Sequence, residues 1–435
     1  MLQNPFYLFF TACLGLFFWA GYRRIFAEVP YRHSLWSFLG EECAPGQRRA
    51  IVRALLAGLP GDSGAMAWIL TMAALCLGGA GALFWYLVFS LLWLHPLGAL
   101  AGLWRYYQPG CGGRAELSAL LEGILCRKRA RARPGLGRLL RWLQTLALCG
   151  MLPLLFRILA SPSAPARGAG LLPWLVVLLA LWLLCRLVGE RGETVLSLLF
   201  LLLLAAALLG NLPNLIPAVK LVLLDAFDRS RFLFSLSGAG LAAALQAGGA
   251  AGCGGALLRT LSAREEGPSF AHPAQAAFYE ELRGLLQLTV QLALGLLFLC
   301  ARLVPEDNRW PQTCLWAFLC LFGLLWLGRV VRALARPEGR RCGLLCLGLV
   351  GAAAVWDIWK GTALLPGLSG GAAGLASLAL AGLLLFDSNW YFLLLEHYRD
   401  VHIWHVTPHP DLMQTEMERK ICDFSHKLSI FSRQF

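Results

Sequence analysis

Residues Val195–Gly210 read VLSLLFLLLLAAALLG, an apolar run without a charged side chain that is too long for a core strand. The chain of 435 residues is 58% hydrophobic and only 14% charged, whereas soluble domains carry about 25% charged residues. This composition predicts an all-α, polytopic membrane protein and excludes a soluble enzyme or a nucleic-acid-binding domain. We therefore interpret the net charge of +13 as a topology signal.

Similar apolar runs predict about eleven transmembrane helices, because a bilayer core of roughly 30 Å needs about 20 helical residues. They form an expected transmembrane domain over residues 1–395, followed by a cytoplasmic tail over residues 396–435. The expected spans are Pro5–Gly21, Ala50–Leu77, Gly81–Trp104, Leu139–Ala160, Gly170–Val188, Thr194–Leu212, Phe232–Leu258, Gly284–Val304, Thr313–Leu334, Cys342–Trp359 and Gly370–Leu395.

Basic residues between the spans predict the orientation of the chain. Arginine and lysine gather in the loops after the first, third and ninth spans, and the densest group lies between Arg105 and Arg138. The alternate loops carry far fewer basic residues. Because basic loops stay in the cytoplasm, we expect a multi-pass protein of the cytoplasmic membrane with its N-terminus outside and its C-terminus inside.

The second and seventh spans contain residues that weaken helices. Gly58–Gly64 reads GLPGDSG, and this segment predicts a break at Gly61, Asp62, Ser63 and Gly64. The seventh span is rich in glycine from Gly238 onward and has Gln246 near its middle. An alternative interpretation is that these glycines only allow close helix packing.

Setting the first span aside leaves ten spans, and the two weakened spans then head two groups of five. This arrangement is typical of LeuT-type inverted-repeat transporters, in which the substrate binds between two discontinuous helices. Unwound backbone inside a membrane is tolerated only where it is buried or lines a cavity. We therefore predict an inverted repeat with two discontinuous helices that form a substrate and ion site.

The segment Gly78–Trp85, GGAGALFW, resembles the GGxGAxFWMW signature of the sodium:alanine (alanine or glycine:cation) symporter family through Gly78, Gly79, Gly81, Phe84 and Trp85. Other stretches resemble the same family in order from about residue 20 to residue 395. The resemblance implies symport of a small amino acid with Na⁺ or H⁺ and no organic cofactor.

Asp62 is the expected coupling residue. Where the family keeps Gly-Thr-Gly-Asn, this chain has Gly64, Ala65, Met66 and Ala67, so polar side chains are absent and Asp62 supplies a carboxylate nearby. An intramembrane carboxylate is a functional candidate, and the alternative role for Asp62 is a helix N-cap.

Gln144 and Gln246 are further candidates, because an uncharged amide inside an apolar span can hydrogen-bond a substrate. Their alternative role is to join neighbouring helices.

Two other functions remain open at this stage. The chain is either a diverged relative that transports another small solute or a transport-inactive sensor or regulatory membrane protein. We expect no enzyme activity and no metal site, because no catalytic nucleophile, phosphate-binding loop or metal-ligand spacing is recognised. The expected partners are the amino acid and the lipid bilayer, and the oligomeric state is left open.

The orientation is tested by labelling the basic loop. A single cysteine introduced between Arg105 and Arg138 should react with a membrane-impermeant thiol reagent only in inside-out vesicles, because a basic loop stays in the cytoplasm. Labelling of that cysteine only from the outside of intact cells would reverse the topology.

Overall fold

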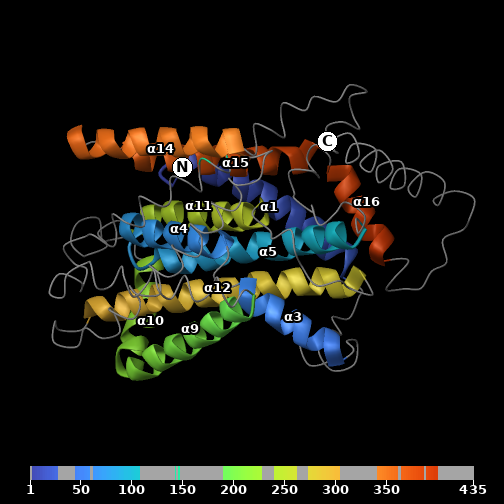
Figure 1. Ribbon diagram of the computed structural model, residues 1–435, viewed down its shortest axis with the longest axis horizontal. Helices are drawn as coiled ribbons and strands as arrows, with labels where there is room; N and C mark the ends of the chain where they lie inside the picture. Colours follow the sequence, from blue (N-terminus) through green and yellow to red (C-terminus); the bar gives the residue numbers. More distant parts are fainter. Residues whose placement is uncertain are drawn as a thin grey trace, which may run out of the picture.

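The computed structural model describes residues 2–27, 45–58, 62–107, 143, 146, 190–227, 240–261, 273–303, 340–360, 364–386 and 388–399. Within these ranges the chain is all-helical, and they contain no strand. The helices, labelled as in Figure 1, are α1 (Pro5–Ile25), α3 (Pro45–Gly58), α4 (Asp62–Gly78), α5 (Ala82–Tyr107), α9 (Glu190–Gly210), α10 (Leu212–Phe227), α11 (Gly240–Leu261), α12 (Pro273–Leu303), α14 (Arg340–Lys360), α15 (Leu364–Phe386) and α16 (Ser388–Tyr398).

Five of these helices, α1, α5, α11, α12 and α15, are long and apolar enough to cross a membrane. A sixth span arises if α9 and α10, which meet at a bend of 87°, are counted together. The expected all-helical class is thus confirmed, with several helices that could span a membrane. Eleven spans stay a prediction. Leu139–Ala160 (apart from two single residues), Gly170–Val188 and Thr313–Leu334 lie outside the described residues. The helices α3, α4 and α14, which cover the expected spans Ala50–Leu77 and Cys342–Trp359, are not among the helices long and apolar enough to cross a membrane.

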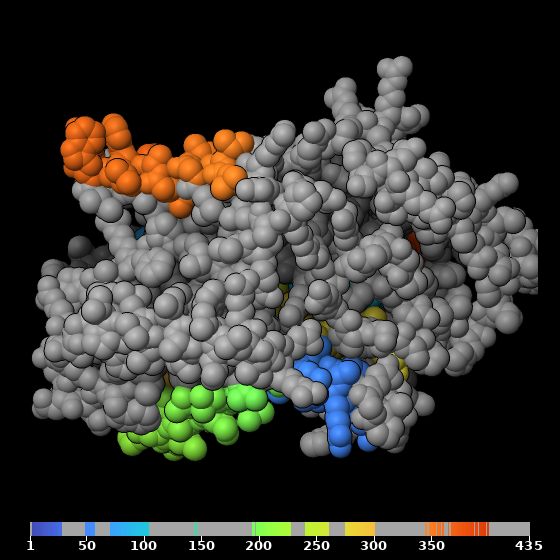
Figure 2. All heavy atoms as spheres, viewed as in Figure 1, coloured from blue at the N-terminus to red at the C-terminus, as the bar shows by residue number. Residues whose placement is uncertain are grey.

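Large apolar side chains point outward from α9 and α14. Val195 and Leu202 of α9, and Val355 and Trp359 of α14, are all at least 60% exposed. Figure 2 shows both helices, in green and orange, on the surface of the molecule. A surface of this kind is unfavourable in water, whereas lipid tails solvate it without cost, so these helices suit a lipid-facing position.

The centre of the fold is the contact of α5 with α11, where backbone meets backbone (Figure 1). Gly248 contacts Ala82, and Gly252 contacts Tyr86, so the two helices run parallel. A Cβ added at Gly252 would lie 2.7 Å from the carbonyl oxygen of Tyr86. Only glycine allows this approach, and small residues serve the same purpose at helix interfaces in membranes.

On its other side, α5 packs against α12. Leu83 contacts Gly295, and Leu94 contacts Gly284, so these two helices run antiparallel. Near the end of α5, Gly102 lies directly on the backbone of α12, with no space for a side chain. The helices α11, α5 and α12 therefore form one tightly packed layer whose contacts depend on glycine.

Helix α1 connects this layer to the C-terminal helices. The ring of Phe18 packs against Trp93 of α5 and Tyr391 of α16, with centroid distances of 5.9 and 5.1 Å. At the other end of α1, the hydroxyl groups of Tyr7 and Ser377 share a hydrogen bond of 2.7 Å. Phe18 and Tyr391, at opposite ends of the described chain, thus belong to one hydrophobic core.

Two expected boundaries are wrong. The span expected at Gly284–Val304 begins earlier, since α12 starts at Pro273 and its candidate span is Gln275–Cys300. The charged residues before Gly284 are buried inside the helix instead of forming a loop. The span expected at Gly370–Leu395 is divided, since α15 ends at Phe386 and α16 begins at Ser388. Only the first of these two helices, over Gly367–Phe386, is long and apolar enough to cross a membrane.

The glycines inside the seventh span do not break it. Helix α11 is uninterrupted from Gly240 to Leu261, and its internal glycines Gly248, Gly249 and Gly252 serve the close packing that was the alternative interpretation. Gly240, the first residue of the helix, has a φ of 62°, a left-handed conformation that favours glycine. A discontinuity in the expected span Phe232–Leu258 would therefore lie before Gly240, outside the described residues.

The packing role of these glycines predicts a contrast between two valine substitutions. Gly252→Val should lower the free energy of unfolding by about 1–3 kcal/mol, because the new side chain meets rigid backbone. Gly351→Val on α14 is the matched control, since nothing lies within 4 Å of that position. Denaturant unfolding of both variants in detergent measures the difference, and equal losses would contradict the packing described for α5 and α11.

Candidate functional site

The residues expected to form the substrate site lie mostly outside the described part of the chain. Gly61, Gln144 and Gly238 belong to the ranges that the structure does not describe. Helix α3 ends at Gly58 and helix α4 begins at Asp62, while the side chains of Asp62, Ser63 and Gly64 are not described. The proposed break in the second span and its coupling carboxylate therefore stay predictions.

Gln246 of α11 contacts the residues that precede α1. Its half-buried side-chain amide donates a hydrogen bond of 3.4 Å to the carbonyl oxygen of Leu2. This contact joins α11 to the chain terminus, which agrees with the alternative role of a residue that connects neighbouring segments.

The signature glycines form the tight connection between α4 and α5. A Cβ added at Gly78 would lie 2.7 Å from the carbonyl oxygen of Ala243 on α11. Gly79 has a φ of 73°, which a side chain would strain. A Cβ at Gly81 would lie 2.5 Å from the backbone nitrogen of Ala226 on α10. The three glycines are thus required by backbone contacts and a turn.

Phe84 and Trp85 hold α10 against this connection. Their rings contact Phe227 at centroid distances of 5.0 and 5.7 Å, and the Trp85 indole donates a hydrogen bond of 3.1 Å to the carbonyl oxygen of Ala226. The buried carboxylate of Asp225 accepts a hydrogen bond of 2.9 Å from the Gly81 N–H at the start of α5, where the helix dipole favours negative charge. The signature segment is thereby a structural junction of α4, α5, α10 and α11.

Sequence analysis missed the polar face of α12. The expected span Gly284–Val304 left Glu280 and Arg283 outside it and included Gln287 and Gln291 without comment, although all four follow the spacing of three and four that places them on one helix face. All four are buried, and two neighbours on the same helix are buried with them. Among the described side chains of α12, the buried polar ones are Gln275, Glu280, Glu281, Arg283, Gln287 and Gln291.

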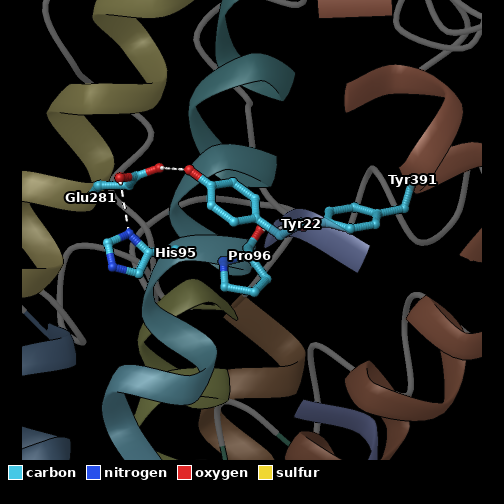
Figure 3. Close-up of polar contacts among 5 residues, drawn as sticks. All are labelled: Tyr22, His95, Pro96, Glu281 and Tyr391. Carbon is cyan, nitrogen blue, oxygen red and sulfur yellow. Dashed lines mark hydrogen bonds and ion pairs between the residues drawn. The ribbon is translucent and has the colours of Figure 1, made fainter. Parts of the chain in front are cut away.

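Glu281 connects three helices (Figure 3). Its Oε1 accepts a hydrogen bond of 3.1 Å from the hydroxyl group of Tyr22 on α1, and its Oε2 lies 3.1 Å from Nδ1 of His95 on α5. Close by, the hydroxyl group of Tyr391 on α16 donates a hydrogen bond of 3.0 Å to the carbonyl oxygen of Pro96. Side chains of α1 and α5 therefore meet at one carboxylate of α12, and Tyr391 of α16 adds a further polar contact on the far side of Tyr22.

A small cavity lies next to this group between α5, α11 and α12. Its volume is about 30 Å³, enough for about two water molecules. Small residues leave this space open, and charged and polar side chains line it. The lining residues are Trp93, Leu94, Leu97, Gly98, Ala101, Ala256, Arg259, Thr260, Glu280, Arg283, Gly284 and Gln287.

The charges around the cavity are balanced locally. Arg283 lies 3.4 Å from Glu280 on the same helix, with both side chains less than a tenth exposed. Arg259 of α11 donates a hydrogen bond of 2.9 Å to the carbonyl oxygen of Gly284. Ionisable residues within membrane helices are expensive and mark functional sites, so this cluster is the best candidate site in the described part of the chain.

A second polar contact continues the same face of α12 toward its C-terminal end. The hydroxyl group of Tyr86 donates a hydrogen bond of 2.6 Å to Oε1 of Gln291. Nε2 of Gln291 is buried and has no hydrogen-bond partner among the described residues. Within the same ranges, no group of three or more His, Cys, Asp and Glu side chains has an arrangement that could hold a metal ion.

No protein-family model matches the chain, and no curated protein matches its sequence.

The buried pair on α12 predicts an asymmetry between single and double substitutions. Arg283→Met should lower the free energy of unfolding by about 3–5 kcal/mol, because it leaves a buried charge without its partner. Combining it with Glu280→Gln should recover most of that loss, because both charges are then absent. Denaturant titration of the two variants measures the effect. Equal or larger destabilisation of the double variant would show that the pair is not buried together.

Proposed function

We propose that the protein is a cation-coupled transporter that moves a small amino acid, such as alanine or glycine, across the cytoplasmic membrane. The observation that carries the proposal is the cluster of Arg259, Glu280, Glu281 and Arg283 inside a layer of apolar helices. Charges buried in such a layer cost stability, and proteins keep them where they bind or move charged species. The resemblance of Gly78–Trp85 to the alanine or glycine:cation symporters supports the amino acid as substrate.

The helix directions support an inverted repeat. Helices α5 and α12 correspond to the second members of the two expected groups of five, and they run antiparallel. Helices α5 and α11 run parallel, as the expected third and seventh spans must if the chain crosses the membrane three times between them. Transporters with inverted repeats operate by moving one group of helices against the other around a central site.

The size of the cavity supports a closed conformation. A volume of about 30 Å³ accepts water molecules but not a whole amino acid. The substrate therefore either enters this cavity after α5 separates from α11 or α12, or binds at another site near Asp62. This requirement fits alternating access, in which the binding site opens to one side of the membrane at a time.

An uptake assay tests the proposal. The full chain is reconstituted into lipid vesicles, and the accumulation of radiolabelled amino acids, alanine and glycine among them, is measured with an inward Na⁺ gradient, an inward proton gradient or neither. We expect alanine or glycine to accumulate above its external concentration with at least one gradient. Asp62→Asn should abolish accumulation but leave exchange of internal and external substrate, because the coupling charge is lost.

Asp357→Asn is the matched control. Asp357 accepts a hydrogen bond of 2.7 Å from the Leu364 N–H near the end of α14, and asparagine can accept the same bond. This variant should therefore accumulate substrate like the wild-type protein. No accumulation of any amino acid under any gradient would contradict the proposal and favour a sensor, and accumulation of a different solute would contradict the assigned substrate class.

A further inference from the structure

Among the buried carboxylates described, Glu281 is distinguished by its contacts with side chains of two other helices. Asp225 accepts from a backbone N–H, and Glu280 lies beside an arginine of its own helix. Glu281 instead accepts a hydrogen bond from Tyr22 of α1 and lies 3.1 Å from the imidazole of His95 on α5. A change in the charge of this group therefore acts directly on the contact of α12 with α1 and α5.

The two members of the pair differ in their exposure. The side chain of Glu281 is 10% exposed, whereas that of His95 is 39% exposed. An ionised carboxylate only accepts hydrogen bonds, so the contact assigns the hydrogen on this side of the ring to Nδ1. The other ring nitrogen, Nε2, is then the atom that can take up a proton from water, while Glu281 remains the buried counter-charge.

The surrounding groups set the charge balance of the pair. Glu280 and Arg283 on α12 neutralise each other, and Arg259 on α11 adds one positive charge. Tyr22 faces the carboxylate from α1, and Tyr391 of α16 lies on the far side of Tyr22, where its hydroxyl group donates a hydrogen bond to the carbonyl oxygen of Pro96. With neutral His95 and ionised Glu281 the whole group has no net charge. A proton on His95 converts the neutral hydrogen bond into an imidazolium–carboxylate pair and adds one positive charge.

Resting on the proposed transport function, we propose that His95 and Glu281 form a proton-binding site in addition to the expected coupling carboxylate of Asp62, so that the proton is the coupled cation. The proton adds to Nε2 of His95, and the Nδ1–H group keeps its hydrogen bond to the carboxylate of Glu281. Tyr22 positions that carboxylate. The loaded site attracts α12 toward α5 more strongly than the empty one, because a bond between two ionised groups is stronger than one with a neutral partner. Proton occupancy thus controls the contact that closes the cavity.

The cavity gives this switch a direct route to the substrate. Gly98 lines the cavity, and a Cβ added there would lie 2.7 Å from Cγ of Glu281, so the site and the cavity share a wall. The extra positive charge of the loaded site also favours a negative group beside Arg259 and Arg283. The carboxylate of an amino acid carries that charge, and its binding would balance the bound proton.

Two measurements test the site, one of which does not depend on transport. Hydrogen–deuterium exchange of the reconstituted protein, corrected for the chemical effect of pH, reports how tightly the segment Pro273–Gly284 of α12 is held. In the wild-type protein this segment should exchange at least threefold faster at pH 8 than at pH 5.5, because the empty site holds α12 less tightly. His95→Asn and Glu281→Gln should remove the difference, since neither retains the pair. His95→Asn keeps a side-chain N–H near the position of Nδ1.

The second measurement is proton-driven uptake of alanine into vesicles, with a pH-sensitive dye inside. His95→Asn and Glu281→Gln should reduce accumulation and internal acidification at least tenfold while substrate exchange continues. Tyr22→Phe should reduce accumulation by a smaller factor. Tyr7→Phe, which removes another buried hydroxyl bond of α1 far from Glu281, should behave like the wild-type protein.

The outcomes separate the two proposals. Hydrogen–deuterium exchange of α12 that depends on pH and needs His95 and Glu281, without any uptake of substrate, supports the proton site and contradicts the transport function. Uptake driven only by Na⁺, or proton-driven uptake that survives both substitutions but is lost in Asp62→Asn, overturns the proton site and leaves the transporter in place. The proton site is also overturned if His95→Asn and Glu281→Gln keep the wild-type difference in hydrogen–deuterium exchange between pH 5.5 and pH 8.

Discussion

The backbone contact of α5 with α11 and α12 is the constraint from which the other features of the fold follow. In a membrane the lipid tails are as apolar as the side chains, so helices associate through close packing and hydrogen bonds rather than through hydrophobic burial. Glycines at positions such as 102 and 252 allow that packing, because any side chain there would meet backbone. Once the three helices are this close, whatever polar groups they carry on the contact faces are removed from water.

The polar face of α12 is acceptable only because its charges are matched. Arg283 lies beside Glu280, Arg259 bonds a helix carbonyl, and Glu281 is held by Tyr22 and His95. Burying an unmatched charge costs far more than such a pair recovers. This cost makes the cluster sensitive to any added charge, whether a proton or the carboxylate of a substrate. Buried charges lower the stability of the fold, and their sensitivity to an added charge is what the proposed coupled transporter would use.

The class of the fold could be predicted from the sequence because apolar length is a strong signal, and the helices α1, α5, α11 and α12 overlap the spans expected there. Glycine was a weaker signal, since it marks a break, a tight turn or a close contact equally well. In the described part of α11 the close contact is what occurs, and at Gly79 it is the turn. Local sequence does not distinguish these cases, because the partner backbone lies far away along the chain.

The candidate site was missed for a related reason. Charges at Glu280, Glu281 and Arg283 normally end a membrane span, and only tertiary contacts with Tyr22 and His95 make them compatible with burial. Cryo-electron microscopy of the protein in a lipid nanodisc tests the account most directly, because the lipid belt is visible around the helices. We predict that the belt surrounds α5, α11 and α12 and that Glu281 lies within its thickness, hydrogen-bonded to Tyr22 and His95. A belt that leaves the segment Glu280–Arg283 in water, or an α12 separated from α5 by lipid, would contradict the account.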